Sequence, residues 1–214
     1  MKTCAIILAR GGSKGIPNKN IRLVKSKPLI QYTIDAATSV VDEVFVSTND
    51  EHIAEISSLL GASIIHRPDK YATDTASSES ALVHAVLQEQ VKEYETIVFI
   101  QPTSPLVTSE DIRRGVEMQE WSRYDSVFSG YREHWIPRWS MTGHPIDWNI
   151  EDRPRRQDKE EVFVENGAFY ITSRRRLIDS GLRYSGNIGM CEMPMSRSFQ
   201  IDTFDDLELV EKML

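Results

Sequence analysis

Residues 5–20 read Ala-Ile-Ile-Leu-Ala-Arg-Gly-Gly-Ser-Lys-Gly-Ile-Pro-Asn-Lys-Asn and contain the features that decide the fold. The apolar run 5–9 is typical of a buried strand. The glycines that follow free the backbone, so that its N–H groups can approach phosphate oxygens closely. They are Gly11, Gly12 and Gly15, and the cations among them are Arg10, Lys14 and Lys19. Because an Arg forks onto two oxygens while a Lys acts as a point charge, we predict a loop that holds several phosphates in a row.

Two commoner phosphate-binding loops do not fit this spacing. The Walker loop needs Gly, four residues and then Gly-Lys-Ser/Thr, and the dinucleotide loop needs Gly-x-Gly-x-x-Gly. Neither pattern occurs in the chain. A solvated turn fits poorly as well, because a turn needs one or two glycines and no cation between them.

Length and composition indicate an ordinary globular protein. At 214 residues the chain can bury one sizeable core, so we expect a single domain over residues 1–214. No apolar run approaches the roughly 18 residues of a membrane helix, and the start lacks the apolar centre of a signal peptide, which favours a cytoplasmic protein without membrane partners. The net charge of −7 argues against a nucleic-acid binder.

Cys4 leads into an apolar strand, where a buried thiol is more plausible than a nucleophile or a disulfide with Cys191.

Strand-like and helix-like segments alternate through most of the chain. Short β-rich runs lie at 43–47, 63–65 and 96–100. Helical spacing is found at 29–37, 53–60, 78–91 and 110–121, with Asp50 and Ser109 as expected N-caps. Repeated strand-helix-strand units predict an α/β fold with three layers, in which a mostly parallel, twisted, Rossmann-like sheet carries helices on both faces. Ligands in such folds gather at the carboxyl ends of the strands, where the glycine-rich loop begins.

Residues 131–160 break this alternation. Three tryptophans and three prolines are crowded into the segment with no clear period; they are Trp135, Pro137, Trp139, Pro145, Trp148 and Pro154. Aromatic residues that do not fit a core pattern often cover a partner surface. A flexible excursion is the alternative interpretation.

Several blocks of the chain resemble the N-acylneuraminate cytidylyltransferases, also called CMP-sialic acid synthetases. The first is the loop Arg10–Asn20, and the later blocks follow in the order of that family. They are Arg67-Pro68 with residues 74–78, residues 101–106, residues 166–170 and residues 201–203. The resemblance covers nearly the whole chain. It implies a nucleotidyltransferase fold in which residues 131–160 form a dimerisation insertion, and hence a homodimer.

The resemblance also implies a reaction and a nucleotide site. The anomeric hydroxyl of a sialic acid or a related nine-carbon 2-keto acid attacks the α-phosphorus of CTP, and pyrophosphate leaves. Arg10, Lys14 and Asp202 would be the catalytic residues. The nucleotide-binding residues would be Ala9, Gly11, Gly12, Ser13, Lys19, Asn20, Arg67, Ala76 and Ser78. Judged from the residues alone, the hydroxyl-rich run 73–78 fits a helix cap better than a base pocket.

The acceptor and metal assignments rest on the same resemblance. Arg156 would bind the carboxylate of the acceptor, and Gln101 and Asn166 would orient its hydroxyls. Mg²⁺ or Mn²⁺ would bind at Asp202, because magnesium needs only one or two protein carboxylates beside phosphates and water. Many relatives carry a second acid two positions earlier, where this chain has Gln200, which offers a neutral oxygen at most. No general base is assigned.

Three alternatives stay open at this point. The acceptor could be legionaminate, pseudaminate or deaminated neuraminate, or the nucleotide could differ; the relatives that transfer to Kdo fit less well because their first loop lacks the Lys-Gly-x-x-Lys-Asn run. The chain could be a non-catalytic nucleotide-sugar-binding module. Asp202 could simply cap the helix that carries Leu207 and Val210.

Overall fold

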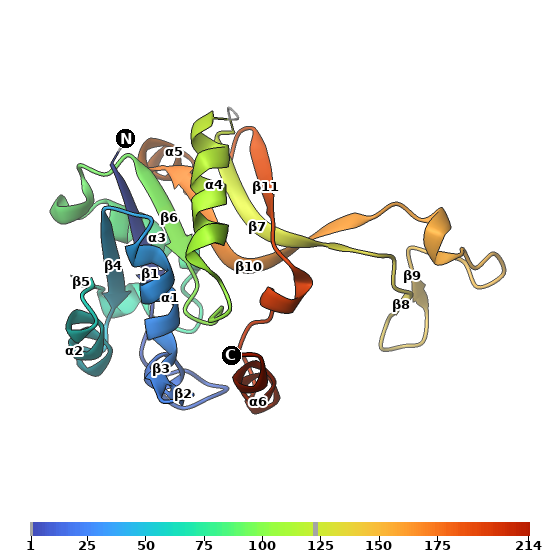
Figure 1. Ribbon diagram of the computed structural model, residues 1–214, viewed down its shortest axis with the longest axis horizontal. Helices are drawn as coiled ribbons and strands as arrows, with labels where there is room; N and C mark the ends of the chain where they lie inside the picture. The colour runs from blue at the N-terminus through green and yellow to red at the C-terminus, as the bar shows by residue number, and fades with distance from the viewer. Residues whose placement is uncertain (1, 122–123) are drawn as a thin grey trace.

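The computed structural model describes residues 2–121 and 124–214 (Figure 1). Within them, seven strands form one twisted sheet in the order β11-β7-β10-β6-β1-β4-β5. The strands are β1 (Thr3–Leu8), β4 (Glu43–Thr48), β5 (Ser63–His66), β6 (Thr96–Ile100), β7 (Ser126–Glu133), β10 (Val162–Ser173) and β11 (Ile188–Glu192). Only β10 runs antiparallel to its neighbours β6 and β7 among these pairs. The expected mostly parallel sheet is confirmed.

Helices cover both faces of the sheet, which gives the three expected layers (Figure 1). α1 (Leu29–Thr38), α2 (Glu51–Leu59) and α4 (Ser109–Trp121) pack on one face, and α3 (Ser78–Val86) and α5 (Arg174–Ser180) on the other. The alternation along β1 sets this division, since Ala5 and Ile7 face the first group while Cys4 and Ile6 face the second.

The C-terminal helix α6 (Phe204–Met213) completes a smaller third cluster. Its Leu207 and Val210 pack with Ile16 of the glycine-rich loop. Ile16 is fully buried, so this contact fixes one end of the loop against α6. The remaining elements are short: β2 (Leu23–Val24), β3 (Lys27–Pro28), β8 (Arg138–Trp139), β9 (Pro145–Ile146) and the 3-10 turns η1 (Lys19–Ile21), η2 (Asp69–Tyr71), η3 (Glu89–Val91), η4 (Arg156–Asp158) and η5 (Met195–Arg197).

Of the two predicted helix N-caps, one is confirmed and one is wrong. Asp50 caps α2 as expected, because its carboxylate accepts hydrogen bonds from the N–H groups of His52 and Ile53. The prediction that Ser109 caps α4 is wrong. Thr108 and Asp111 exchange hydrogen bonds around the first turn instead, so Ser109 is the first helical residue.

Residues 131–160 form most of an arm that projects from the body (Figure 1). β7 and β10 continue past the sheet as a two-stranded ribbon, in which Glu133 pairs with Val162, and the ribbon carries β8 and β9. The three tryptophans contact one another. Trp148 packs edge to face against Trp135 and Trp139, with ring centroids 6.2 and 4.9 Å apart. The arm therefore has an aromatic cluster of its own, formed by Trp135, Trp139 and Trp148.

The described part of the chain contains no helix with the length and apolar character that crossing a membrane requires. Both thiols are buried, as expected for Cys4. Burial raises the pKa of both, that of Cys191 to about 11, which makes either a poor nucleophile near neutral pH.

Candidate active site

The glycine-rich loop leaves the carboxyl end of β1 and is held there by hydrogen bonds to β4 and to the side chain of Asn49, which follows β4. Ala9 N–H donates to the carbonyl of Ser47 at 3.0 Å, and Gly11 N–H donates to Asn49 Oδ1 at 3.1 Å. From the far end of the loop, the buried Asn20 side chain donates to the Arg10 carbonyl at 3.0 Å. These bonds close the loop on itself.

Four of the nine predicted nucleotide-binding residues, Ser13, Lys19, Asn20 and Ser78, line one cavity of about 210 Å³ beside this loop. The loop contributes Arg10, Ser13, Lys14, Gly15, Lys19 and Asn20, and other elements contribute Ser78 and Gln101. A second hollow of about 190 Å³ shares Arg10, Ser13 and Asn20 and adds Gly11 and Gly12. The structure thus brings together residues that are up to 91 positions apart, all beyond the carboxyl ends of β1, β5 and β6.

Each loop cation has a carboxylate partner. Asp74 lies 2.8 Å from both Arg10 and Lys14, and their hydrogen bonds lower the pKa of its carboxyl group. Lys19 contacts Asp202 at 2.9 Å and donates to the Ile201 carbonyl at 3.0 Å. Asp74 was not among the predicted site residues, although it lies in a block that the resemblance identified.

The Asp202 side chain contacts Lys19 of the glycine-rich loop and does not cap α6. Thr203 is the N-cap, and it exchanges hydrogen bonds with Asp206 in a capping box. The Asp202 carbonyl lies so close to Gly15 that a Cβ there would meet it at 2.6 Å, which requires glycine at position 15. The alternative in which Asp202 caps the helix is therefore wrong.

A metal ion would find few protein ligands here. Among the described residues there is no group of three or more His, Cys, Asp and Glu side chains placed to hold one. Asp202 is 66% exposed and bonds Lys19 through one carboxylate oxygen. One carboxylate fits a magnesium ion whose other ligands are phosphates and water.

Arg67 is a buried cation next to the loop. Its side chain donates to the Ser47 carbonyl at 3.1 Å, and its Nε is one of the buried atoms that lack a hydrogen-bond partner within the described residues. Burial and the charge of Arg10 lower the pKa of Arg67 to about 10. An unpaired buried donor is costly unless a ligand satisfies it, so Arg67 suits an acceptor oxygen.

In the hydroxyl-rich run 73–78, one serine caps a helix and the next lines the cavity. Ser77 caps α3, because its Oγ accepts from the Ser80 N–H at 3.1 Å. Ser78 instead lines the cavity. Ala76 donates its N–H to the Thr73 carbonyl at 3.2 Å.

Asn166 is held by the protein on every side. Its Oδ1 accepts from Ser129 Oγ and from the Ala168 N–H, and its Nδ2 donates to Ser198 Oγ at 2.9 Å. These bonds shape the irregularity in β10, where Gly167 has φ +70°. Gln101 and Gln200 flank Gly167, and Gln200 donates to the Asn166 carbonyl at 2.6 Å. Asn166 therefore positions this wall of the site.

Arg156 is not part of this assembly. It lies in η4, on the arm that projects from the body (Figure 1). Its side chain is exposed. The structure of one chain does not bring Arg156 to the cavity.

An aromatic and charged cluster next to the cavity was missed from the sequence. Arg183 lies over the rings of Phe99 and Tyr170 and contacts Glu79 at 2.5 Å. Phe99 lines the cavity, and Tyr170 pairs with it across β6 and β10. Arg183 is remote in sequence from Phe99 and Glu79 and carries no motif, so no local pattern could have identified it.

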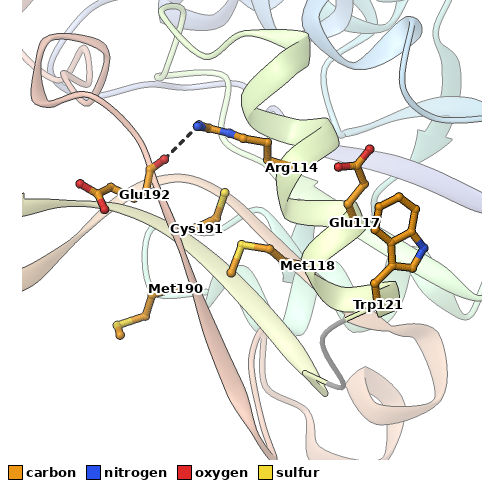
Figure 2. Close-up of a pocket in the computed structure, with 7 residues that line it drawn as sticks. All are labelled: Arg114, Glu117, Met118, Trp121, Met190, Cys191 and Glu192. Carbon is orange, nitrogen blue, oxygen red and sulfur yellow. Dashed lines mark hydrogen bonds between the residues drawn. The ribbon is translucent and has the colours of Figure 1, made fainter.

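A larger hollow of about 420 Å³ lies elsewhere, between α4 and β11 (Figure 2). Arg114 points across it and donates to the Glu192 carbonyl at 3.0 Å, while Trp121 and Met190 are exposed at its rim (Figure 2). None of the predicted site residues lines this hollow. The glycine-rich loop and its cavity are the stronger candidate for the active site.

Comparison with known proteins identifies related sequences. Over residues 4–213 the chain matches the family described as Cytidylyltransferase. N-acylneuraminate cytidylyltransferase A of Danio rerio is 37% identical over 217 residues, covering 97% of this chain and 50% of that protein. N-acylneuraminate cytidylyltransferase of Streptococcus agalactiae serotype V is 33% identical, with 96% and 52% covered. The chain spans about half the length of these relatives.

Solved structures show the same architecture. A CMP:2-keto-3-deoxy-manno-octonic acid synthetase complexed with CTP matches with a TM-score of 0.75 and 21% identity, covering 100% of this chain and 98% of that one. 4-Diphosphocytidyl-2C-methyl-D-erythritol synthase from Anaerococcus prevotii matches with a TM-score of 0.65 and 13% identity, covering 99% and 97%. At such identities the likeness concerns the fold alone.

Proposed function

The chain belongs to the cytidylyltransferase family, and from this premise we propose that it transfers CMP from CTP to the anomeric hydroxyl of a sialic acid or a related nine-carbon 2-keto acid. One observation carries the proposal. Arg10, Lys14 and Lys19 line a single cavity with Ser78 and Gln101. Three cations on a closed loop suit a triphosphate, and the relatives named N-acylneuraminate cytidylyltransferase suggest the acceptor.

In this proposal the loop cations align the triphosphate and neutralise charge. The acceptor oxygen forms a bond to the α-phosphorus, the bond from that phosphorus to the β-phosphate breaks, and pyrophosphate leaves. Arg10 and Lys14 stabilise negative charge that develops on the phosphates, and Lys19 adds a third positive charge. The acceptor hydroxyl gives up its proton to a group that we do not assign.

We assign base recognition to Asn20 and Ser78, which line the cavity, together with Arg67 and the Ala76 backbone, which do not line it. The unpaired Nε of Arg67 and the Ser78 hydroxyl supply donors for a pyrimidine edge. Short side chains at 76–78 favour a small base over a purine. A bound Mg²⁺ or Mn²⁺ would add positive charge at the phosphates, with Asp202 as its protein carboxylate and Gln200 as a neutral neighbour.

The acceptor site and the oligomeric state are proposed together. The Arg156 guanidinium could bind the carboxylate of the acceptor. However, η4 lies on the arm that projects from the body (Figure 1), and Arg156 does not line the cavity of the same chain. Several apolar side chains on the arm are exposed, among them Ile136, Trp139, Ile146 and Val162. We therefore propose a homodimer in which the arm packs on a second copy and Arg156 reaches the acceptor there. The cytoplasmic location expected from the sequence stays a prediction.

A pyrophosphate-release assay with CTP, Mg²⁺ and a panel of nine-carbon 2-keto acids tests the proposed function. Pyrophosphate should appear only when CTP and a suitable acid are both present, and the acid with the highest kcat/KM identifies the acceptor class. Legionaminate, pseudaminate and deaminated neuraminate belong in the panel as alternatives. Binding of CTP without release with any acid would favour a non-catalytic nucleotide-sugar-binding module.

A further inference from the structure

Asp74 occupies the space between the two cations that the proposed function assigns to phosphate. Its two carboxylate oxygens take one cation each, since Oδ1 lies 2.8 Å from Arg10 and Oδ2 lies 2.8 Å from Lys14. A phosphate group bridges two cations in the same way, with one oxygen to each. Asp74 therefore satisfies the cations while no anionic ligand is bound.

The short segment that carries Asp74 is held against the loop at a second point. Arg10 also donates to the Ala72 carbonyl, at 3.3 Å. The same segment continues into Ala76 and the Ser77 cap of α3, so Asp74 lies between two anchored points. Lys14 is 73% exposed and Asp74 is 46% exposed, which makes both contacts reachable by a ligand from solvent.

Asp74 is charged at neutral pH. Hydrogen bonds from Lys14 and Arg10 lower the pKa of its carboxyl group below the ordinary value. A ligand that enters between the cations must therefore replace a full negative charge.

We propose that Asp74 is an internal counter-ion that competes with phosphate for Arg10 and Lys14, and so sets how strongly the loop discriminates between polyphosphates and less charged anions. The inference rests on the proposed phosphate-binding role of the loop. A ligand with several negative charges displaces Asp74, whereas a singly charged anion gains little from doing so. When the polyphosphate leaves, Asp74 returns to the cations and favours its release.

Calorimetric titration with inorganic pyrophosphate, without metal or acceptor, tests this role. Asp74→Asn should bind pyrophosphate about three to ten times more tightly than the wild type, because two exposed ion pairs of modest strength no longer compete. Asp74→Glu keeps the carboxylate and should stay close to the wild type. Asp35→Asn is the matched control, since Asp35 forms an exposed ion pair with Lys27 and its loss changes the net charge equally.

Cytidine, which carries no phosphate, serves as a second probe and should bind the wild type and Asp74→Asn alike. Unchanged or weaker pyrophosphate binding by Asp74→Asn, with an unaltered thermal unfolding midpoint, would overturn the proposal and make Asp74 a brace of the loop. An equal gain for cytidine, or for Asp35→Asn, would overturn it too. Because the titration involves no turnover, a chain that fails to release pyrophosphate from CTP can still give the predicted result.

Discussion

Lys14 and Lys19 differ in how much their side chains are buried and bonded within the protein. The side chain of Lys14 is 73% exposed and forms an ion pair with Asp74. That of Lys19 is 16% exposed and donates a hydrogen bond to the Ile201 carbonyl. A change at Lys14 therefore isolates the chemistry of the loop, while a change at Lys19 also loosens the contact between the loop and the segment before α6.

Lys14→Ala should lower kcat/KM for CTP by roughly 100-fold, which corresponds to about 3 kcal/mol of lost transition-state stabilisation. Steady-state kinetics measure the effect, and a thermal melt should show an unchanged unfolding midpoint. Lys27→Ala is the matched control, because Lys27 pairs with Asp35 on the surface and lies outside the cavity. Near-wild-type activity in Lys14→Ala would mean that the loop does not bind the reacting phosphates.

Asp202→Asn should nearly abolish activity and leave the stability of the protein unchanged, because Thr203 and Asp206 cap α6 without it. Activity and the thermal midpoint are measured on the same preparation. In the complementary variant, Gln200→Asp, a second carboxylate should lower the Mg²⁺ concentration needed for half-maximal rate. An active Asp202→Asn enzyme with unchanged metal dependence would remove the proposed metal ligand.

The candidate site residues that a sequence pattern identifies most readily are those that lie close together in the chain. The loop cations lie within ten residues of one another, so their common purpose is visible in the chain itself. Arg183 and Asp74 were missed as site residues because their contacts arise only when distant segments meet. The role of Asn166 was also hidden, since a sequence does not reveal that all its hydrogen-bonding groups are used by the protein.

At the scale of elements, periodicity located the strands and helices but not their ends. The helix expected over 78–91 ends at Val86 and resumes as η3, yet Val91 is still buried, so the apolar pattern continues across a break in the helix. The predicted N-cap of α4 was wrong by one residue, because the hydroxyl groups of Thr108 and Ser109 can both cap a helix. Which of them caps depends on the reciprocal bond with Asp111.

The arm is the element whose purpose is most open to test. Trp135→Glu combined with Trp139→Glu should convert a dimer into monomers, as measured by light scattering, because both rings lie on the tryptophan cluster of the arm. Arg156→Lys should leave the dimer intact and raise the Michaelis constant for the acceptor more than that for CTP, since a planar fork on a carboxylate is poorly replaced by a point charge.

Two results would contradict this account of the arm. A wild-type protein that is already monomeric at micromolar concentration excludes the proposed interface. Equal effects of Arg156→Lys on both substrates would remove Arg156 from the acceptor.

For the molecule as a whole, one buried carboxylate ties α4 to the segment that leads into α6. Asp111 is fully buried and accepts two hydrogen bonds from Arg197, at 2.6 and 3.2 Å, and one from Arg114. Burial alone would raise the pKa of Asp111, but the bonds from Arg197 and Thr108 lower it. This ion pair fixes η5 and the chain that follows it relative to the sheet.

Asp111→Asn should lower the free energy of unfolding at pH 7 by about 3 kcal/mol, because it leaves paired cations without their buried partner. A depressed pKa in the folded state means that this stabilisation is complete above the unfolded value of roughly 4 and is lost as the pH falls through the folded value. Urea unfolding at pH 7 and at lower pH should therefore show the wild type and the variant converging in acid. A constant difference at every pH would contradict the assignment.

The architecture was predictable because α/β alternation repeats over the whole chain, and each repeat supports the same conclusion. The placement of the arm was not, since a ribbon that leaves the sheet has no period that distinguishes it from a loop. Whether residues 1–214 act as one domain stays a prediction.

³¹P NMR of a reaction mixture can show whether the acceptor receives the α-phosphorus of CTP. With CTP, Mg²⁺ and the preferred nine-carbon acid, the triphosphate signals should be replaced by one phosphodiester signal and one pyrophosphate signal of twice its integrated intensity, because equimolar pyrophosphate carries two phosphorus atoms. Lys14→Ala should show the same products at a much lower rate. Formation of CMP and pyrophosphate without a phosphodiester, or persistence of CTP with every acid, would contradict the claim.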